Sequence, residues 1–146
     1  MNIIQALIHS IASIQPIHPL FVHFPIALVS AGLFFILLAL IFRKDVLEKI
    51  AFADMALATV STVAAAITGI HDNSVNYNGN APNHSAKIIL ASTLFVILTI
   101  TVLARWRDKE LFHKRWGKAV YVAAYFVCFA IVSVLGYLGG VIVYGI

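Results

Sequence analysis

The chain has 146 residues, of which 62% are hydrophobic and 11% are charged, and its formal charge at pH 7 is +4. This composition excludes an ordinary soluble domain, and the length suits a single domain. All but one of the ten Lys and Arg residues fall in two short segments. The positive charge therefore indicates the orientation of a membrane protein and gives no sign of nucleic-acid binding.

Residues 1–15 have the pattern of an amphipathic helix. Isoleucine and leucine recur there at helical spacing, polar residues stand between them, and Lys and Arg are absent. The missing positive charge argues against a signal peptide. We expect this segment to lie flat on the outer surface of the membrane, with His9 on its polar face. A four-transmembrane-helix domain over residues 16–146 is expected to follow it.

Four long apolar blocks follow, each close to the roughly 20 residues that a helix needs to cross the hydrocarbon core. They span Leu20–Phe42, Ile50–Ile70, Ala86–Ala104 and Ala119–Val143. The helices of a soluble bundle would show a polar stripe for water, and the central stretches of these blocks show none. The sequence therefore predicts an all-α fold, an integral membrane four-helix bundle in contact with the lipid bilayer.

Two basic segments fix the predicted orientation of the bundle. The first contains Arg43, Lys44 and Lys49, and the second contains Arg105, Arg107, Lys109, Lys114, Arg115 and Lys118. These segments connect the first predicted helix to the second and the third to the fourth, whereas Lys87 lies on the other side. The positive-inside rule places both segments in the cytoplasm, so both termini are expected to face outward. Trp106 and Trp116 flank the second segment, as interfacial anchors do.

The first span opens with a run that contains two histidines and two prolines, His18-Pro19-Leu20-Phe21-Val22-His23-Phe24-Pro25-Ile26. Proline suits the first turn of a helix, where its missing N–H is of little consequence. If the helix begins at Pro19, Pro25 introduces a kink. If it begins near Pro25, His18 and His23 belong to a tight surface segment. In either case both imidazoles lie at or just below the outer interface.

The second span ends with Gly69, His71 and Asp72. We expect Gly69 to permit close approach of a neighbouring helix and Asp72 to accept a hydrogen bond from a nearby imidazole N–H. The neutral polar residues 73–83 are expected to form a loop that faces outward.

The third predicted helix brings a further histidine to the same side of the membrane. Asn83 is a plausible N-cap for this helix, which places His84 in its first turn. Three of the four helices therefore each carry a histidine at the outer end of the bundle.

This histidine set favours haem over other metal sites. The chain has no compact set of four nitrogen or sulfur ligands, which a structural zinc site needs. Haem needs only one or two imidazoles from facing helices and an apolar slot between them. We expect a b-type haem with His23 and His84 as the axial ligands of its iron, and with His18 and His71 as the substitutes. Alternatively, the histidines only hydrogen-bond to headgroups, helix caps and loop carbonyls.

The fourth predicted helix contains Gly136, Gly139 and Gly140, which form a GxxxG arrangement. Such glycines allow tight helix contact in lipid, either inside the bundle or in a homo-oligomer. They also clear space beside a planar cofactor. Tyr137 and Tyr144 fit an aromatic belt at the outer interface, and either could instead hydrogen-bond to a haem propionate or a quinone.

Two further residues inside the spans have simple interpretations. Asp54 lies near the cytoplasmic start of the second predicted helix, and we interpret it as a charge at a helix N-terminus rather than a proton carrier. Cys128 is the only cysteine of the chain. It excludes an intrachain disulfide, and we interpret it as a small buried hydrophobe.

The motifs of the first and last spans resemble a known family. The run HPLFVHFPI over residues 18–26 and the glycine-rich run over residues 136–144 are similar to those of uncharacterised bacterial four-helix membrane proteins, domain of unknown function 2231. The resemblance covers nearly the whole chain after residue 15. It implies a multi-pass protein of the bacterial inner membrane, in which the outward-facing termini are periplasmic. It implies no activity.

Three functions are compatible with the sequence. The first is a small b-type cytochrome that passes electrons between the quinone pool and a periplasmic redox partner. The second is a copper or other transition-metal site, since imidazole suits several of these metals. The third is a cofactor-free accessory subunit of a larger membrane complex. A hydrolase is disfavoured because no serine lies in a G-x-S-x-G elbow.

Overall fold

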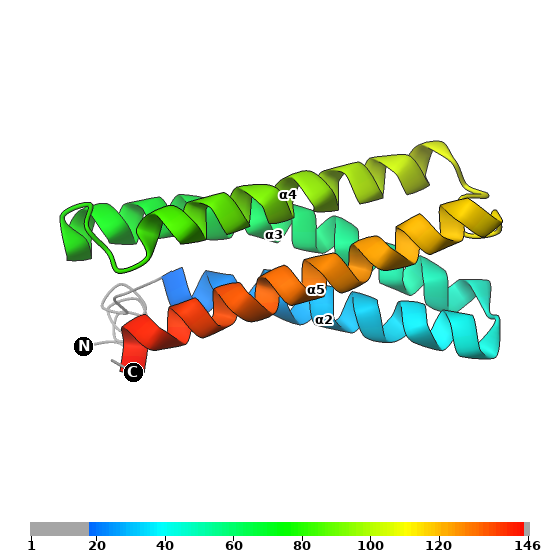
Figure 1. The fold of residues 1–146 in the computed structure, drawn as a ribbon, viewed down its shortest axis with the longest axis horizontal. Coiled ribbons are helices and arrows are strands. Elements are labelled where there is room, and N and C mark those ends of the chain that lie inside the picture. Colours follow the sequence, from blue (N-terminus) through cyan, green and yellow to red (C-terminus); the bar gives the residue numbers. More distant parts are fainter. Residues whose placement is uncertain (1–17, 145–146) are drawn as a thin grey trace, which may run out of the picture.

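The protein is described by a computed structural model that covers residues 18–144 and contains four long helices (Figure 1). They are α2 (His18–Phe42), α3 (Asp45–Tyr77), α4 (His84–Arg107) and α5 (Arg115–Tyr144). Each is long and apolar enough to cross a membrane, and no strand occurs in the described part of the chain. The predicted four-helix membrane bundle is confirmed. The amphipathic helix predicted for residues 1–15 lies outside the described residues.

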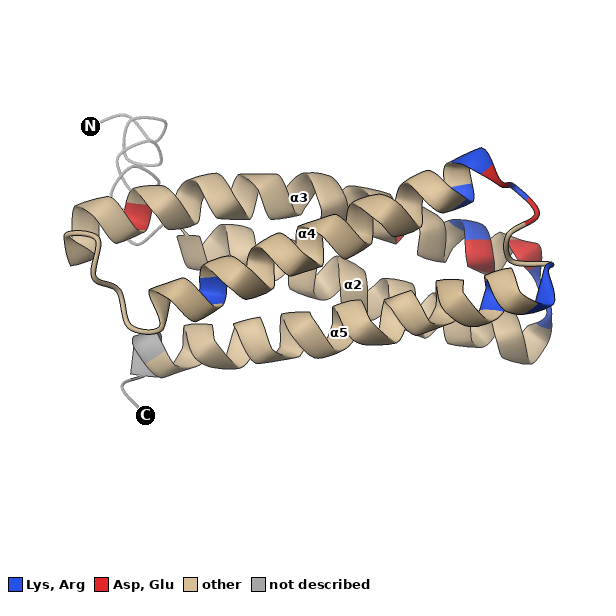
Figure 2. Cartoon of the chain, turned by 45° about the horizontal axis from the view of Figure 1, so that its top comes forward, with Lys and Arg blue, Asp and Glu red and all other residues tan. Residues whose placement is uncertain are grey.

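Successive helices run antiparallel, and in cross-section the four helices lie at the corners of a square. The main chains of α2 and α4 each approach those of both α3 and α5. The main chains of α2 and α4, and likewise those of α3 and α5, stay farther apart, so these pairs occupy the diagonals. Figure 2 shows that Lys and Arg gather at the end where α2 joins α3 and α4 joins α5. We call this the inner end of the bundle. The opposite end, where α2 begins and α3 joins α4, is the outer end.

α2 begins at His18 and places Pro19 in its first turn, while Pro25 is buried inside the helix. The first of the two alternatives for this run is therefore correct, and His23 lies within the helix. A kink at Pro25 stays a prediction. In lipid, the main-chain carbonyl that an internal proline leaves without a partner must be satisfied by neighbouring groups.

α3 is longer at both ends than the apolar block predicts. It starts at Asp45, where acidic residues in the first turn favour a helix N-terminus. It continues to Tyr77 and ends at Asn78 and Gly79, both in the left-handed conformation with φ of 48° and 82°. The Gly79 N–H donates to the carbonyl of Asn73 at 2.9 Å, as in a Schellman-type C-cap. The loop predicted for residues 73–83 is therefore wrong over 73–77.

Most of the side chains buried in the core of the bundle are apolar. Its fully buried side chains include Val29, Ile36, Leu94, Leu98 and Val132. Cys128 is fully buried among them, which confirms its interpretation as a buried hydrophobe. Large hydrophobic side chains are also exposed on the faces of all four helices that point away from the core, as expected where a helix contacts lipid.

Candidate functional site

The outer end is held together by a carboxylate on α3. Asp72 is 6% exposed, and its Oδ2 accepts the main-chain N–H of His18 at 2.8 Å. The first N–H groups of a helix have no partner within that helix, so this bond caps the start of α2. The sequence analysis expected Asp72 to accept a hydrogen bond from an imidazole N–H. Among the described residues it accepts one from the main chain of His18 instead.

The imidazole of His18 packs directly against α3. A Cβ built on Gly69 would lie 2.9 Å from His18 Cε1, so only glycine leaves room for the ring. Thr68 Oγ1 donates to the carbonyls of Ala64 and Ala65 at 3.1 Å. The same oxygen lies 3.3 Å from His18 Nδ1 and therefore accepts the Nδ1–H. This network leaves Nε2 of His18 unprotonated, and it confirms the close approach expected at Gly69.

His84 is engaged by a buried amide on α3. Asn73 accepts the main-chain N–H of Ala81 through Oδ1 at 3.0 Å, which turns its Nδ2 toward His84 Nε2 at 3.3 Å. Since the amide nitrogen donates, Nε2 of His84 accepts and its proton is on Nδ1. Asn83 is the N-cap residue of α4, as predicted, and His84 lies in the first turn. The φ of Asn83 is 55° and its side chain makes no capping hydrogen bond.

His23 is exposed, and its Nδ1 is hydrogen-bonded to the carbonyl of Pro19 on its own helix. Since a carbonyl only accepts, Nδ1 carries the proton and Nε2 keeps its lone pair. No other hydrogen bond of this ring occurs among residues 18–144. Counted from Phe42, which precedes the first basic residues, His23 lies about 28 Å along the axis of α2. This is close to the thickness of the hydrocarbon core.

A glycine on α5 leaves open space at the depth of His23. A Cβ built on Gly136 would meet Ile26 of the antiparallel α2 at 3.5 Å. One turn farther out, His23 on α2 and Gly139 on α5 therefore lie at the same level. No atom of the described residues lies within 4 Å of a Cβ built on Gly139. His23 and this open space thus share the same depth in the bundle.

The four predicted ligands have different environments. His23 and His84 come from the two helices that flank α5, whereas the ring of His18 is held against α3. His71 is exposed, and its ring makes no hydrogen bond with the described residues. Within residues 18–144, no three His, Cys, Asp or Glu side chains converge as a metal site. The structure therefore gives no support to a copper or zinc centre built from three or more ligands.

A buried polar network at the inner end was missed from the sequence. Glu48 is 2% exposed, and Arg105 donates to its two oxygens from Nε at 2.7 Å and from Nη2 at 2.9 Å. The hydroxyl of Tyr121 donates to the same carboxylate at 3.2 Å, and it lies 2.9 Å from the hydroxyl of Tyr125. The network joins α3, α4 and α5. A signal was present, since Glu48 lies near the start of one helix and Arg105 near the end of its antiparallel neighbour.

The interpretation of Asp54 as a charge at a helix N-terminus is wrong, because α3 begins at Asp45 and Asp54 lies in its third turn. The first-turn charges of this helix are Asp45 and Glu48. Asp54 is half-buried beside Gly32, where Tyr125 also approaches. Its Oδ2 is buried and has no hydrogen-bond partner among the described residues.

Comparison with known proteins identifies the family and no function. Neither the curated proteins nor the solved structures include a match to this chain. The family described as "Predicted membrane protein (DUF2231)" matches residues 14–146, which include all four helices and the histidines of the outer end. The chain therefore belongs to the DUF2231 family of predicted membrane proteins.

Proposed function

We propose that this chain is a small b-type cytochrome of the bacterial inner membrane, with haem at the outer end of the bundle. The observation that carries the proposal is the state of His23. Its Nδ1 is held by the carbonyl of Pro19, and its ring lies level with the open space beside Gly139. Ligating histidines commonly donate their second ring N–H to a carbonyl, because that bond fixes the tautomer and orients the ring.

The packing of the helices offers a place for a planar cofactor. α5 contacts both α2, which carries His23, and α4, which carries His84. As a ligand, His84 would use the Nε2 lone pair that now accepts from Asn73. His18 and His71 remain the substitutes. When bound in this way, a haem supplies one-electron transfer.

We propose that the electrons pass between the quinone pool and a periplasmic redox partner. The proposed ligands lie at the end of the bundle opposite the basic connections (Figure 2). The positive-inside rule assigns the basic connections to the cytoplasm and therefore the ligand end to the periplasmic side. A periplasmic protein can approach this end from water, and a quinone can approach it from the bilayer. The same charge distribution supports a multi-pass protein with both termini in the periplasm.

The test is an absorption spectrum of the detergent-purified chain, oxidised and then dithionite-reduced, after expression with adequate haem supply. We expect a Soret band and resolved α and β bands in the reduced state. His23→Ala should abolish them, and His84→Ala should abolish them or convert the spectrum to a five-coordinate form. His113→Ala is the matched control, because this exposed histidine lies at the inner end, away from the proposed haem. A featureless spectrum of the unaltered chain contradicts the proposal.

The second candidate function is a cofactor-free accessory subunit of a larger membrane complex. One observation favours it: the rings of His18 and His84 both make hydrogen bonds to side chains of α3 without any cofactor. Under this alternative, His18→Ala and His84→Ala lower the stability of the purified chain, and no variant shows a haem spectrum. Co-purification of a defined membrane complex with the chain would support it.

A further inference from the structure

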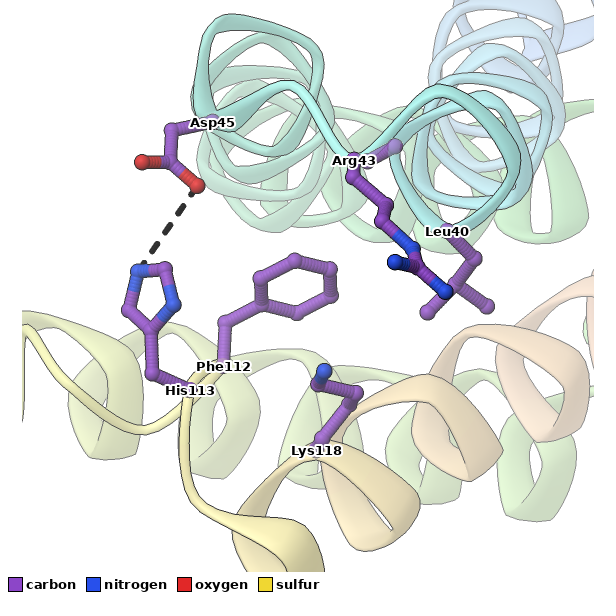
Figure 3. A pocket seen from close by; sticks show the side chains of 7 residues that line it. Leu40, Arg43, Asp45, Phe112, His113 and Lys118 are labelled. Carbon is purple, nitrogen blue, oxygen red and sulfur yellow. Dashed lines mark ion pairs between the residues drawn. The ribbon is translucent and has the colours of Figure 1, made fainter.

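A cavity of about 440 Å³ opens at the inner end, between the connection from α2 to α3 and the start of α5 (Figure 3). Its apolar side is formed by Ala39, Leu40 and Phe112, and its polar side includes Arg43, His113 and Lys118. In Figure 3 the side chain of Arg43 lies beside Leu40, and that of Lys118 ends below the ring of Phe112. The cavity therefore combines an apolar wall with two cations that come from different elements.

Neither of these two cations has an acidic partner among the described residues, in contrast to Lys114 nearby. Lys114 donates to Asp108 at 2.5 Å, a hydrogen bond that lowers the pKa of the Asp108 carboxyl below its usual value. Neither Arg43 nor Lys118 has a carboxylate within 4.0 Å among residues 18–144. The cavity thus has uncompensated positive charge where its two sides meet.

One carboxylate also lines the cavity, on the side away from Arg43. Asp45 Oδ1 lies 3.7 Å from His113 Nε2, at the edge opposite Arg43 in Figure 3. The ammonium group of Lys118 lies 5.2 Å from the centre of the Phe112 ring, which orients it beside the apolar wall. An anion in this cavity would therefore contact Arg43 and Lys118 and remain away from Asp45.

The position of the cavity identifies the kind of anion. Arg43 directly follows Phe42, the last residue of α2, and adopts φ of 52° at this helix end. This left-handed turn ends the apolar helix and begins the basic connection, which marks the boundary between hydrocarbon and headgroups. A small soluble anion would gain no favourable contact from the apolar wall at this depth. A phospholipid needs both parts, cations for its phosphate and an apolar surface for the start of its acyl chains.

We propose that this cavity binds the phosphodiester of an anionic phospholipid of the inner leaflet. Arg43 and Lys118 contact the phosphate, and Leu40 and Phe112 contact the first methylenes of the acyl chains. Basic pockets between membrane helices on the cytoplasmic side are suited to such headgroups. The inference does not depend on the haem proposal, because it concerns the other end of the bundle.

The experiment measures lipid binding to the purified full chain by native mass spectrometry, with phosphatidylglycerol and phosphatidylcholine of matched acyl chains. We expect about tenfold tighter binding of phosphatidylglycerol. Arg43→Gln with Lys118→Gln should reduce this preference to less than twofold. The matched control is Lys44→Gln with Arg115→Gln, which removes the same charge from neighbouring exposed positions outside the cavity. This control should keep at least half of the preference.

Two results would overturn the proposal. Equal loss of preference in the cavity variant and in the control would show a diffuse basic surface. Displacement of phosphatidylglycerol by millimolar inorganic phosphate would show a site for a soluble anion. Should the double glutamine variant fail to fold, Arg43→Gln and Lys118→Gln are measured singly, and each should lower the preference severalfold. Arg43→Lys retains the charge and should retain binding in either case.

Discussion

At the scale of single residues, the outer end depends on a few polar side chains that replace water for main-chain groups. Asp72 caps α2, and Asn73 links Ala81 to His84. A main-chain group without a partner is costly to bury, especially near lipid. The histidines of this end are therefore bound into the structure to different degrees, and the rings of His23 and His71 make no hydrogen bond to another described helix.

Asp72→Ala removes the acceptor for the His18 N–H and should destabilise the start of α2. Loss of an N-terminal capping side chain costs about 1 kcal/mol. We expect a lower midpoint of thermal unfolding in detergent, with Asp72→Asn close to the unaltered chain because its amide oxygen still accepts. Equal midpoints for the alanine and asparagine variants would contradict the capping role.

Two glycine substitutions should separate stability from cofactor binding. Gly69→Ala places a Cβ 2.9 Å from the ring of His18, so the ring must move. The free energy of unfolding should fall by about 1–3 kcal/mol.

Gly139→Leu extends into open space and should leave the thermal midpoint of the cofactor-free chain within about 1 °C. If haem binds beside His23, this second variant should contain severalfold less haem per protein. Unchanged haem content would place the cofactor elsewhere.

At the scale of elements, the helices extend beyond their apolar blocks. α3 has 33 residues and is about 50 Å long, whereas its predicted block covers only Ile50–Ile70. Hydropathy identifies the part of a helix that lies in lipid and gives no information about its polar ends. The dipeptide Asn78-Gly79 is a typical helix stop signal, and it would have placed the end of α3 correctly.

The inner polar network should contribute strongly to the association of α3, α4 and α5. Glu48→Ala leaves Arg105 without its partner, and removing one member of a buried ion pair costs about 3–5 kcal/mol. We expect a correspondingly large loss in the free energy of unfolding, measured by denaturant titration in detergent. Glu110→Ala removes an exposed carboxylate of the neighbouring loop and should change it by less than about 0.5 kcal/mol. Similar losses in both variants would show that the network is not the cause.

At the scale of the whole molecule, the fold was predictable and the details of the site were not. Span number and the common depth of His18, His23 and His84 follow from hydropathy and from charge. Whether a ring faces α3, α5 or lipid depends on the rotation of each helix about its axis, and nearly uniform apolar sequences carry little information about that rotation. The pairing of Glu48 with Arg105 across 57 positions of sequence was missed for the same reason.

The orientation can be tested by labelling introduced cysteines on intact bacterial cells. In a Cys128→Ser background, Asn80→Cys should react with a membrane-impermeant maleimide, because the connection between α3 and α4 is predicted to face the periplasm. Lys109→Cys should react only after the inner membrane is disrupted. Both positions are exposed in the structure, so accessibility within the fold does not limit the reaction. The reverse labelling pattern would invert the proposed topology.

The short link between α2 and α3 has a consequence for biogenesis. Only Arg43 and Lys44 separate these helices, and α2 packs more extensively on α3 than on any other described helix. Contacts between segments close in sequence form with little loss of chain entropy. The pair can therefore enter the bilayer as one helical hairpin while the ribosome is still synthesising α4 and α5. The later helices then dock on a surface that is already assembled.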